Sequence, residues 1–497
     1  MNGRRWWKWG VAGVLAGALA CDVGGSRPEP EPEQAWEDEA ADDVEPLTSE
    51  ALAASEEKPS PVTLEVPGGS TPSPSPVVYP DARGWTFYGP EHGAPTEVLG
   101  VTEDEGGNLW VAGGEEGLFL LRPGASTFER FTMEHGLRPY GYMPDGKAPV
   151  GPKYLKVIAV TGGPAGTVFV GYQGQADCES NYYRGKGIKH PNVYKSGDAD
   201  KVTLTETGIR VVHYDISSGP GVVGEEAGGR EKVCSILRIA WDKKHGHLWF
   251  GANHAFAWGD PNYEGNPTCG GQRECSGVLE HTHPHISAKT ASGHVFRLTD
   301  AYYGIAVRPD GDVWFGGANR STRFRFMTNK VPRDFERARK MSETRSAMKN
   351  RLDIWPDKVD EVGIPGPGDR VDDLVSGMAV MPDGSVWVSS FAWGLAHMDA
   401  TGVVRRYTLN TGGDRFVSAM GRDPSDDSIW AGHRWGGGLT RLKGDTVMRY
   451  SQALGGLASR PVHDIQSAGS GPERRLVVAF GRDEKGRPGA IGIYNGE

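Results

Sequence analysis

One motif recurs seven times after residue 97, and it constrains the fold more than any other feature of this chain. VLGVTEDEGGNLWVAG (98–113) returns as VIAVTGGPAGTVFVGY, LRIAWDKKHGHLWFGA, YGIAVRPDGDVWFGG, SGMAVMPDGSVWVSS, SAMGRDPSDDSIWAGH and HDIQSAGSGPERRLVVAFG. Each copy reads as an apolar strand, a turn rich in Gly or Asp, and a second strand centred on an aromatic residue or Val. That order is typical of a β-hairpin.

The spacing of the motif indicates four strands in each unit. The central residues are Trp110, Phe169, Trp249, Trp314, Trp387, Trp430 and Val477, at intervals of 59, 80, 65, 73, 43 and 47 residues. The last two intervals match a four-stranded propeller blade of about 40–50 residues. Third and fourth strands are visible in GLFLLRP with STFERFT and in GLTRLKG with TVMRYS. The sequence therefore predicts an all-β fold, a seven-bladed β-propeller over 84–497, with insertions at 171–191, 217–234, 252–293 and 328–373.

The last unit ends after three strands, at GAIGIYNG (489–496). An aromatic strand without a unit of its own, Trp85-Thr86-Phe87-Tyr88, opens the repeat region. We predict that this N-terminal strand supplies the missing outer strand of the last blade, because ring closure removes the open sheet edges.

Several copies resemble known propeller repeats. GNLWVAGGEEGLFLL (107–121) and GGGLTRL (436–442) resemble the two-component-regulator propeller repeat, and PDGDVWFGG and PDGSVWVSS resemble both that repeat and the streptogramin-lyase propeller. The first resemblance implies a sensor-like or binding domain outside the cytoplasm. The second implies an alternative, a metal-dependent lyase or hydrolase, because streptogramin lyases use His and Glu with a magnesium ion near one propeller face.

The N-terminus is predicted to be a targeting segment. Residues 1–20 combine the basic RRWWKW with the apolar run GVAGVLAGALA, which is too short to span a bilayer. Ala18-Leu19-Ala20-Cys21 resembles the lipobox of bacterial lipoproteins. We expect acylation of Cys21 to anchor the chain in a lipid bilayer of the bacterial cell envelope, at the inner or outer membrane and facing the periplasm or the exterior. An ordinary signal peptide cut nearby is the alternative.

The next segment, 21–80, is acidic and rich in Pro. The first twenty residues carry a charge of +3 and the next sixty −12, so −1 remains of the total of −10. Self-repulsion and few apolar groups predict a disordered, extended tether. The near-neutral remainder argues against a nucleic-acid partner.

We expect the insertions to lie on one face of the ring. We call "top" the face that carries the second-to-third and fourth-to-first strand connections. The insertions at 171–191, 217–234 and 252–286 are all predicted there. They hold the four cysteines that remain beside Cys21, and export permits disulfides. Four cysteines allow three pairings, of which we favour Cys178–Cys234 and Cys269–Cys275. A further insertion, 330–353, is basic and reads as a helix.

Residues with no backbone reason to occupy turns gather on the same predicted face. Trp, Arg and His there suggest a surface that binds an envelope protein or a carbohydrate-like ligand, although they could equally only pack the inserted loops. The predicted ligand- or partner-binding residues are His254, Tyr303, Asn319, Arg320, Trp393, His433, Arg434, Trp435 and His463. Lys156, Ser376 and Ser418 begin equivalent inner strands and should lie beside them.

The sequence also contains a candidate metal site. In EHTHPH, His281, His283 and His285 alternate, and alternating residues of a strand point to one side. This cluster is the basis of the lyase or hydrolase alternative, with a divalent metal as its cofactor, although Pro284 interrupts a regular strand. We identify no catalytic residue and expect no other cofactor. A binding or scaffold protein is the interpretation that we favour, and enzymatic activity stays open.

Overall fold

The structure is a computed structural model. It describes residues 77–78, 80–139, 154–174, 198–214, 216–217, 235–252, 255–259, 261, 279–282, 287–289, 295–297, 302–309, 311, 313–317, 320–324, 352–355, 375–390, 394–398, 404–407, 417–434, 438–444, 446–467 and 476–496.

The described residues form seven sheets of four or five strands and one two-stranded sheet. Numbered in chain order, sheet 1 is β3 (Gly100–Glu103), β4 (Leu109–Ala112), β5 (Leu118–Leu121) and β6 (Glu129–Phe131), and sheet 2 is β7 (Val157–Gly162), β8 (Thr167–Tyr172), β9 (Ala199–Leu204) and β10 (Ile209–Tyr214). Sheet 3 is β12 (Ile236–Asp242), β13 (His247–Ala252), β14 (Ala255–Gly259), β15 (Leu279–Thr282) and β11 (Ile216–Ser217), and sheet 4 is β18 (Gly304–Val307), β19 (Val313–Gly317), β20 (Arg320–Phe324) and β21 (Leu352–Trp355).

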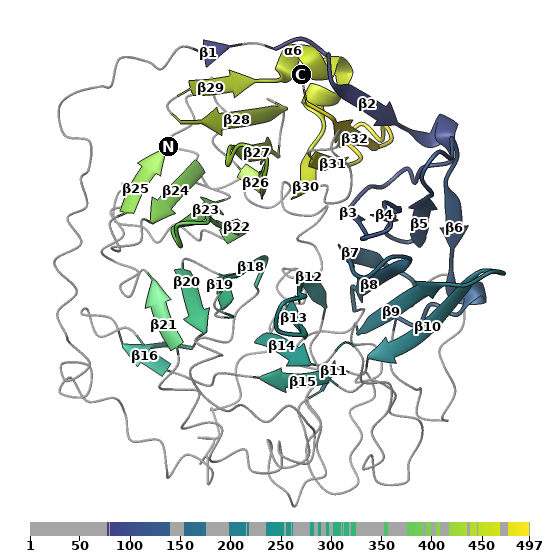
Figure 1. Ribbon diagram of the computed structural model, residues 1–497, viewed down its shortest axis with the longest axis horizontal. Helices are drawn as coiled ribbons and strands as arrows, with labels where there is room; N and C mark the ends of the chain where they lie inside the picture. The colour runs from purple at the N-terminus through teal and green to yellow at the C-terminus, as the bar shows by residue number, and fades with distance from the viewer. Residues whose placement is uncertain are drawn as a thin grey trace, which may run out of the picture.

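Sheet 5 is β22 (Val375–Val380), β23 (Val386–Ser390), β24 (Gly394–Met398) and β25 (Val404–Tyr407). Sheet 6 is β26 (Val417–Arg422), β27 (Ile429–His433), β28 (Leu439–Lys443), β29 (Thr446–Arg449) and β1 (Val77–Val78), and sheet 7 is β30 (Val462–Ser467), β31 (Leu476–Phe480), β32 (Ala490–Tyr494) and β2 (Trp85–Tyr88). Figure 1 shows these sheets set around a common centre, with the first strand of each innermost. The predicted all-β propeller is confirmed.

The predicted closing strand is present in the last sheet. β2 pairs antiparallel with β32, from Trp85 opposite Tyr494 to Tyr88 opposite Ile491. The Trp85 ring lies 5.1 Å from that of Tyr494 and 6.1 Å from that of Trp430 in sheet 6. Trp85 thus packs between the last two sheets, so the ring is joined by a contact between distant parts of the sequence.

The first described strand lies earlier in the chain than predicted. β1 pairs in parallel with β29, Val77 beside Val447 and Val78 beside Met448. The prediction of a disordered tether extending to residue 80 is therefore wrong for its last residues. Two adjacent Val residues favour an extended strand, and the edge of sheet 6 offers them backbone partners.

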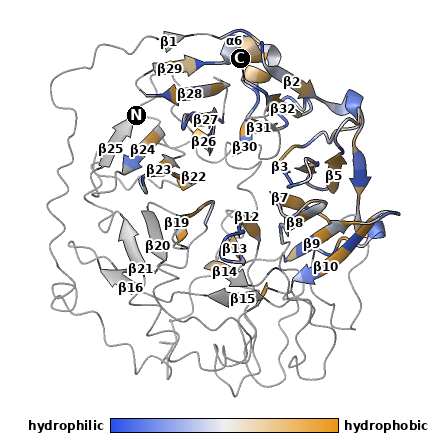
Figure 2. Ribbon diagram, viewed as in Figure 1, coloured by the Kyte–Doolittle hydropathy of each residue, from blue (hydrophilic) through white to orange (hydrophobic). Residues whose placement is uncertain are grey.

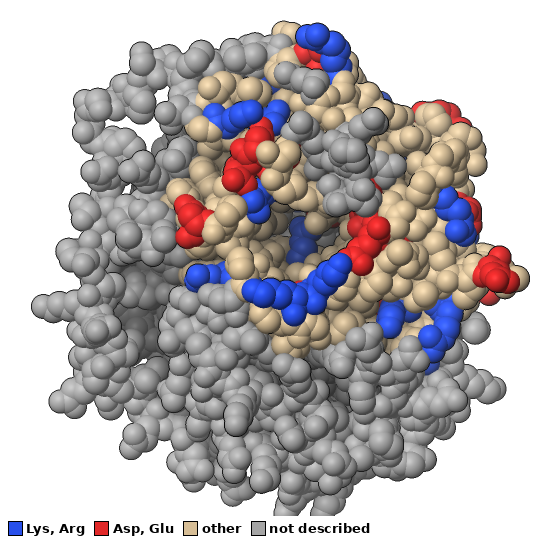
Figure 3. Space-filling model, in the orientation of Figure 1, with Lys and Arg blue, Asp and Glu red and all other residues tan. Residues whose placement is uncertain are grey.

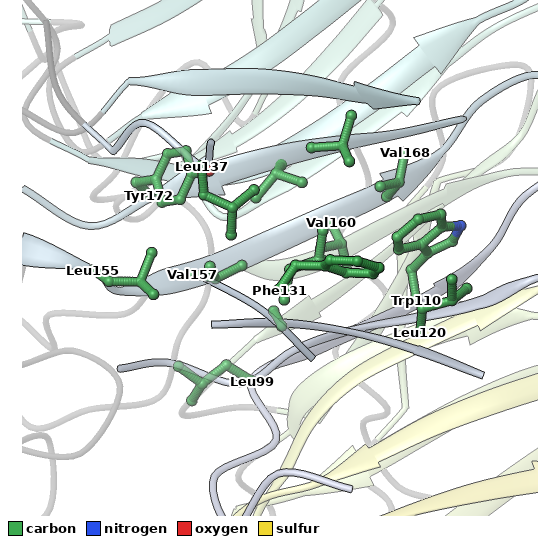
Figure 4. Packing of buried hydrophobic residues seen from close by; sticks show 14 residues of the cluster. Leu99, Trp110, Leu120, Phe131, Leu137, Leu155, Val157, Val160, Val168 and Tyr172 are labelled. Carbon is green, nitrogen blue, oxygen red and sulfur yellow. The ribbon is translucent and has the colours of Figure 1, made fainter. Parts of the chain in front are cut away.

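The central residues of the repeat form the interior. All seven, from Trp110 to Val477, are at most 9% exposed. Figure 4 shows how sheets 1 and 2 pack: Trp110 and Phe131 of sheet 1 meet Val160 and Val168 of sheet 2. In Figure 2, apolar residues follow the strands, whereas the outer strand β6 is largely hydrophilic. Neighbouring sheets therefore stabilise one another by burying apolar faces.

Two predictions are wrong: that the whole insertion at 252–286 follows a second strand, and that all four cysteines belong to connections on the top face. Ala255–Gly259 is the third strand of sheet 3 and Leu279–Thr282 its fourth, so 260–278 joins third to fourth strand and leaves from the face opposite the top. Cys269 and Cys275 belong to that connection, whereas Cys178 follows β8 and Cys234 precedes β12. The short run AFAWG lacks the repeat motif, so the sequence did not mark it as a strand. The four cysteines, and both predicted disulfides, lie outside the described residues.

The basic segment ends before residue 352. Leu352–Trp355 is the fourth strand of sheet 4, so a helix cannot extend to residue 353 as predicted. The rest of that segment lies outside the described residues, as does Cys21. Among the residues that the structure describes, no helix is long and apolar enough to cross a membrane.

Candidate functional site

An irregularity repeats at the start of the innermost strands. In sheets 2, 3, 5, 6 and 7 the pairing of the first two strands skips one residue, for example Ile158 between Val157 and Ala159. In sheet 1, the amide of Leu99 donates to Ala112, which also faces Gly100. In sheet 4, the amide of Tyr303 donates to the carbonyl of Gly316, and Gly316 also pairs with Gly304. Each sheet thus has one extra residue at its inner edge, a β-bulge that redirects its side chain.

These seven bulge residues line one cavity of about 70 Å³ at the centre of the ring. They are Leu99, Ile158, Leu237, Tyr303, Ser376, Ser418 and His463. Sheets 1 to 3 contribute the apolar members and sheets 4 to 7 the polar ones, so the cavity has an apolar side and a polar side. Lys156 and Gln173 also line it. Figure 3 shows the molecule hollowed at its centre, with basic side chains at the hollow and acidic ones beside it.

The polar bulge residues also connect neighbouring sheets. Ser376 Oγ donates to the carbonyl of Val417 at 2.6 Å, and Ser418 Oγ donates to that of Val462 at 2.5 Å. At the equivalent place, His463 Nδ1 lies 2.9 Å from the carbonyl of Val98. A carbonyl only accepts, so Nδ1 carries the proton and, in the neutral ring, Nε2 is an acceptor. The same position therefore fastens sheets 5, 6, 7 and 1 in sequence.

One ion pair crosses the centre. The residues that follow the bulges are Gly100, Ala159, Arg238, Gly304, Gly377, Ala419 and Asp464, and five of these are Gly or Ala. The small residues leave room for Arg238 Nη1 of sheet 3 to reach Asp464 Oδ1 of sheet 7 at 2.6 Å. Arg238 Nε also donates to the Tyr303 carbonyl at 3.0 Å. Sheets 3 and 7 are three sheets apart around the ring, so this pair spans the cavity.

Asp464 is almost enclosed, with 5% of its side chain exposed. Besides Arg238, its carboxylate accepts from the amides of Val101 at 3.2 Å and Ile465 at 3.0 Å, and from Gln466 Nε2 at 2.8 Å. Four donors around one carboxylate satisfy its charge. Its partner Arg238 keeps 21% of its side chain exposed. The cationic member of the pair is therefore the more accessible one.

Three of the predicted binding residues come together from sheets 4, 6 and 7. Tyr303 and His463 line the cavity, and the charge of Arg434, at the end of β27, acts on the pKa of both. Burial, helped by the nearby charge of Arg434, lowers the pKa of His463 to about 4. Burial raises the pKa of the Tyr303 hydroxyl and lowers that of Arg434. At pH 7 the tyrosine and histidine are neutral, and the arginine is a cation 9% exposed.

Acidic residues of sheet 1 flank the same side. Glu116 Oε1 accepts from the Thr96 amide at 2.7 Å and from the Glu97 amide at 3.2 Å. Burial raises the pKa of Glu97, Lys156 opposes the change, and Glu115 and Glu116 add to it. Glu97 is not among the residues that line the cavity. The cavity thus has a basic interior and an acidic margin.

The remaining predicted residues have other positions. His433 is fully buried, and its Nε2 lies 2.8 Å from Thr440 Oγ1. Arg320 begins β20 and His281 lies in β15, facing Ala257. The other predicted binding and metal residues lie outside the described residues: His254, Asn319, Trp393, Trp435, His283 and His285. Within the described part, no group of three side chains could hold a metal ion.

Sequence reasoning missed Arg238 and Asp464. The sequence did contain a signal: at the position after the bulge, five copies of the repeat have Gly or Ala and two have a charged residue. Their opposite charges would have suggested a pair, but only ring closure shows that they meet.

No known protein-family profile and no curated protein matches this sequence. Among solved structures, the chain is similar to YCF48 bound to D1 peptide, with 11% identity and a TM-score of 0.48 over 86% of this chain and 100% of that one. It is also similar to the extracellular domain of BT4673 from B. thetaiotaomicron, named as a hybrid two-component system, with 12% identity and a TM-score of 0.40. That comparison covers 84% of this chain and 39% of the other. At these identities and TM-scores the likeness carries no conclusion about function.

Proposed function

We propose that this chain is an extracytoplasmic binding protein, anchored at a membrane through acylated Cys21, that holds an envelope protein or a carbohydrate-like ligand over the centre of its ring. One observation supports the proposal most: the bulge residues of all seven sheets converge on one cavity with an apolar side and a polar side. Pockets that bind ligands combine apolar walls with a few placed polar groups.

The size of the cavity limits what enters it. Its volume is about 70 Å³. A single side chain or substituent of the ligand suits a cavity of this size. We therefore expect the ligand to place a single group in the cavity and to make its other contacts outside it.

The metal-dependent lyase or hydrolase alternative depends on His281, His283 and His285. The structure describes only the backbone at His281, in the outer strand β15. No observation on the described residues favours this alternative over binding.

The test compares two arginines of sheet 6 at opposite ends of the ring axis. Arg434 follows the second strand, beside the cavity, and Arg422 ends the first strand at the other face. Full-length protein with Arg434→Ala and Tyr303→Ala, and a control with Arg422→Ala, would be made in the native cells and purified after reversible cross-linking. We expect the partner recovered with the wild type to be lost from the first variant and kept by the control.

Thermal unfolding of each variant shows whether the fold is retained. Recovery of the same partner by a folded Tyr303 and Arg434 variant would refute the proposal.

A further inference from the structure

We propose that the central cavity binds one carboxylate group of the ligand, with Arg238 and Lys156 as its cationic partners. This inference rests on the proposed function, because it specifies which chemical group of the ligand enters the cavity. The carboxylate can belong to a peptide, to an acidic sugar or to a small acid, which share this group.

The charge of the cavity lining favours a monoanion. Among the described residues that line it, the charged side chains are Lys156, Arg238 and Asp464, a net charge of +1. Asp464 already accepts from four donors. A single carboxylate would neutralise the remaining positive charge, whereas a phosphate dianion would exceed it. Outside the lining, Arg434 adds a positive charge near Tyr303 and His463, and Glu484 lies near Arg434.

The geometry of Arg238 suits the same ligand. Its Nη1 contacts Asp464 and its Nε the Tyr303 carbonyl, which fixes the plane of the guanidinium. A guanidinium has five N–H donors, and carboxylates accept from two of them at once. The fixed group lies in the cavity wall with 21% of its side chain exposed. Little side-chain freedom is lost when a carboxylate binds to a guanidinium that is already held.

The neutral groups of the lining add no negative charge. The hydroxyl protons of Ser376 and Ser418 go to backbone carbonyls, and His463 is neutral at pH 7. Glu97, near Lys156, stands outside the lining, and burial raises its pKa. Among the described lining residues, Asp464 is thus the acidic side chain near a bound carboxylate. Its charge is already paired with that of Arg238.

The test uses propionate and its uncharged amide as probes. Binding to the full-length protein would be followed by ligand-observed NMR at constant ionic strength, with sodium phosphate as a second anion. We expect propionate to bind in the millimolar range and propionamide not to bind. Lys156→Met should weaken propionate binding about tenfold, the loss of one charge-assisted contact, and Lys243→Met at the opposite face should not change it.

Asp464→Asn gives a result of the opposite sign. It removes the competing negative charge, keeps one oxygen that can still accept from the Ile465 amide, and leaves Arg238 to the ligand. Propionate should then bind about tenfold more tightly. A damaged fold cannot produce tighter binding, so this gain is specific.

Three outcomes would overturn the inference: equal binding of propionate and propionamide, binding of phosphate alone, or weaker propionate binding by the Asp464→Asn variant. If any of them occurred while the Arg434 and Tyr303 variant still lost its partner, the proposed function would stand without the carboxylate. Propionate binding in a protein that recovers no partner would leave a carboxylate site without the proposed role.

Discussion

His463 makes the stability of the ring depend on pH. In the folded chain burial lowers its pKa to about 4, whereas an unfolded histidine titrates near 6.5. Between these values the unfolded state binds more protons than the folded state. The contribution of His463 to the free energy of unfolding is therefore complete above about pH 6.5. It is lost as the pH falls from about 6.5 to about 4.

His463→Gln should remove that part of the pH dependence. Urea unfolding at pH 7.5 and pH 4.5 would give a smaller difference in the free energy of unfolding for this variant than for the wild type. His135→Gln, at an exposed position, is the control and should retain the wild-type difference. The interpretation is wrong if the His463 and His135 variants behave alike.

Asp200 holds a buried polar cluster in sheet 2. Its carboxylate accepts from Tyr172 Oη at 2.5 Å, from the Arg138 amide at 2.8 Å and from His213 Nδ1 at 2.9 Å. His213 also lies 3.3 Å from Asp198. Burial lowers the pKa of His213, but the two aspartates together raise it above its ordinary value. This cluster joins strands β8, β9 and β10 at the base of two insertions.

Asp200→Asn should cost about 3–5 kcal/mol in the free energy of unfolding, because it breaks a buried ion pair on one side. Asp81→Asn, whose partner Arg83 is exposed, should leave that free energy unchanged. Urea denaturation at pH 6 measures both. Similar values for the two variants would show that the cluster does not stabilise sheet 2.

At the scale of the strand, a small residue always stands two positions after the central residue of the repeat. The seven are Ala112, Gly171, Gly251, Gly316, Ser389, Gly432 and Ala479. The first inner residue of the next sheet packs there: a Cβ at Gly432 would collide with Val462, and one at Gly316 with Val375. Sheet-to-sheet distance is therefore set by this position.

Gly432→Ala should destabilise the protein by about 1–3 kcal/mol, because Val462 has to move. Gly456→Ala, where an added Cβ meets nothing within 4 Å, is the matched control and should be neutral. Thermal unfolding compares them directly. Equal melting temperatures would mean that sheets 6 and 7 adjust freely.

The period of the repeat was sufficient to predict the strands but not the bulges. Alternating apolar residues and Gly-rich turns are local signals, so the hairpins and the closing strand at Trp85 could be predicted. A bulge depends on the register between two strands, and the sequence of either strand alone does not determine that register. Arg238 and Asp464 are 226 residues apart, so their contact follows only from closing the ring.

At the scale of the whole molecule, closure depends on Trp85. Its ring stacks on Phe87 at 5.6 Å and contacts Tyr450 at 6.0 Å, besides Trp430 and Tyr494. Trp85→Ala should cost about 3–5 kcal/mol, as expected for a large aromatic side chain packed between two sheets. Removing residues 1–79, which include β1 with its two paired residues, should change the melting temperature much less. If removing residues 1–79 destabilised the protein more than Trp85→Ala, the contact that closes the ring would lie in β1.

The central claim is that the ligand or partner is held at the centre of the ring, on the side where the inner strands begin. A photoreactive phenylalanine analogue in place of Leu237, a bulge residue of the cavity, tests it most directly. The control carries the analogue in place of Lys243, in the turn at the other end of β12. After irradiation of native cells, we expect a covalent adduct at position 237 and none at position 243. Adducts at position 243 alone, or equally at both, would contradict the account.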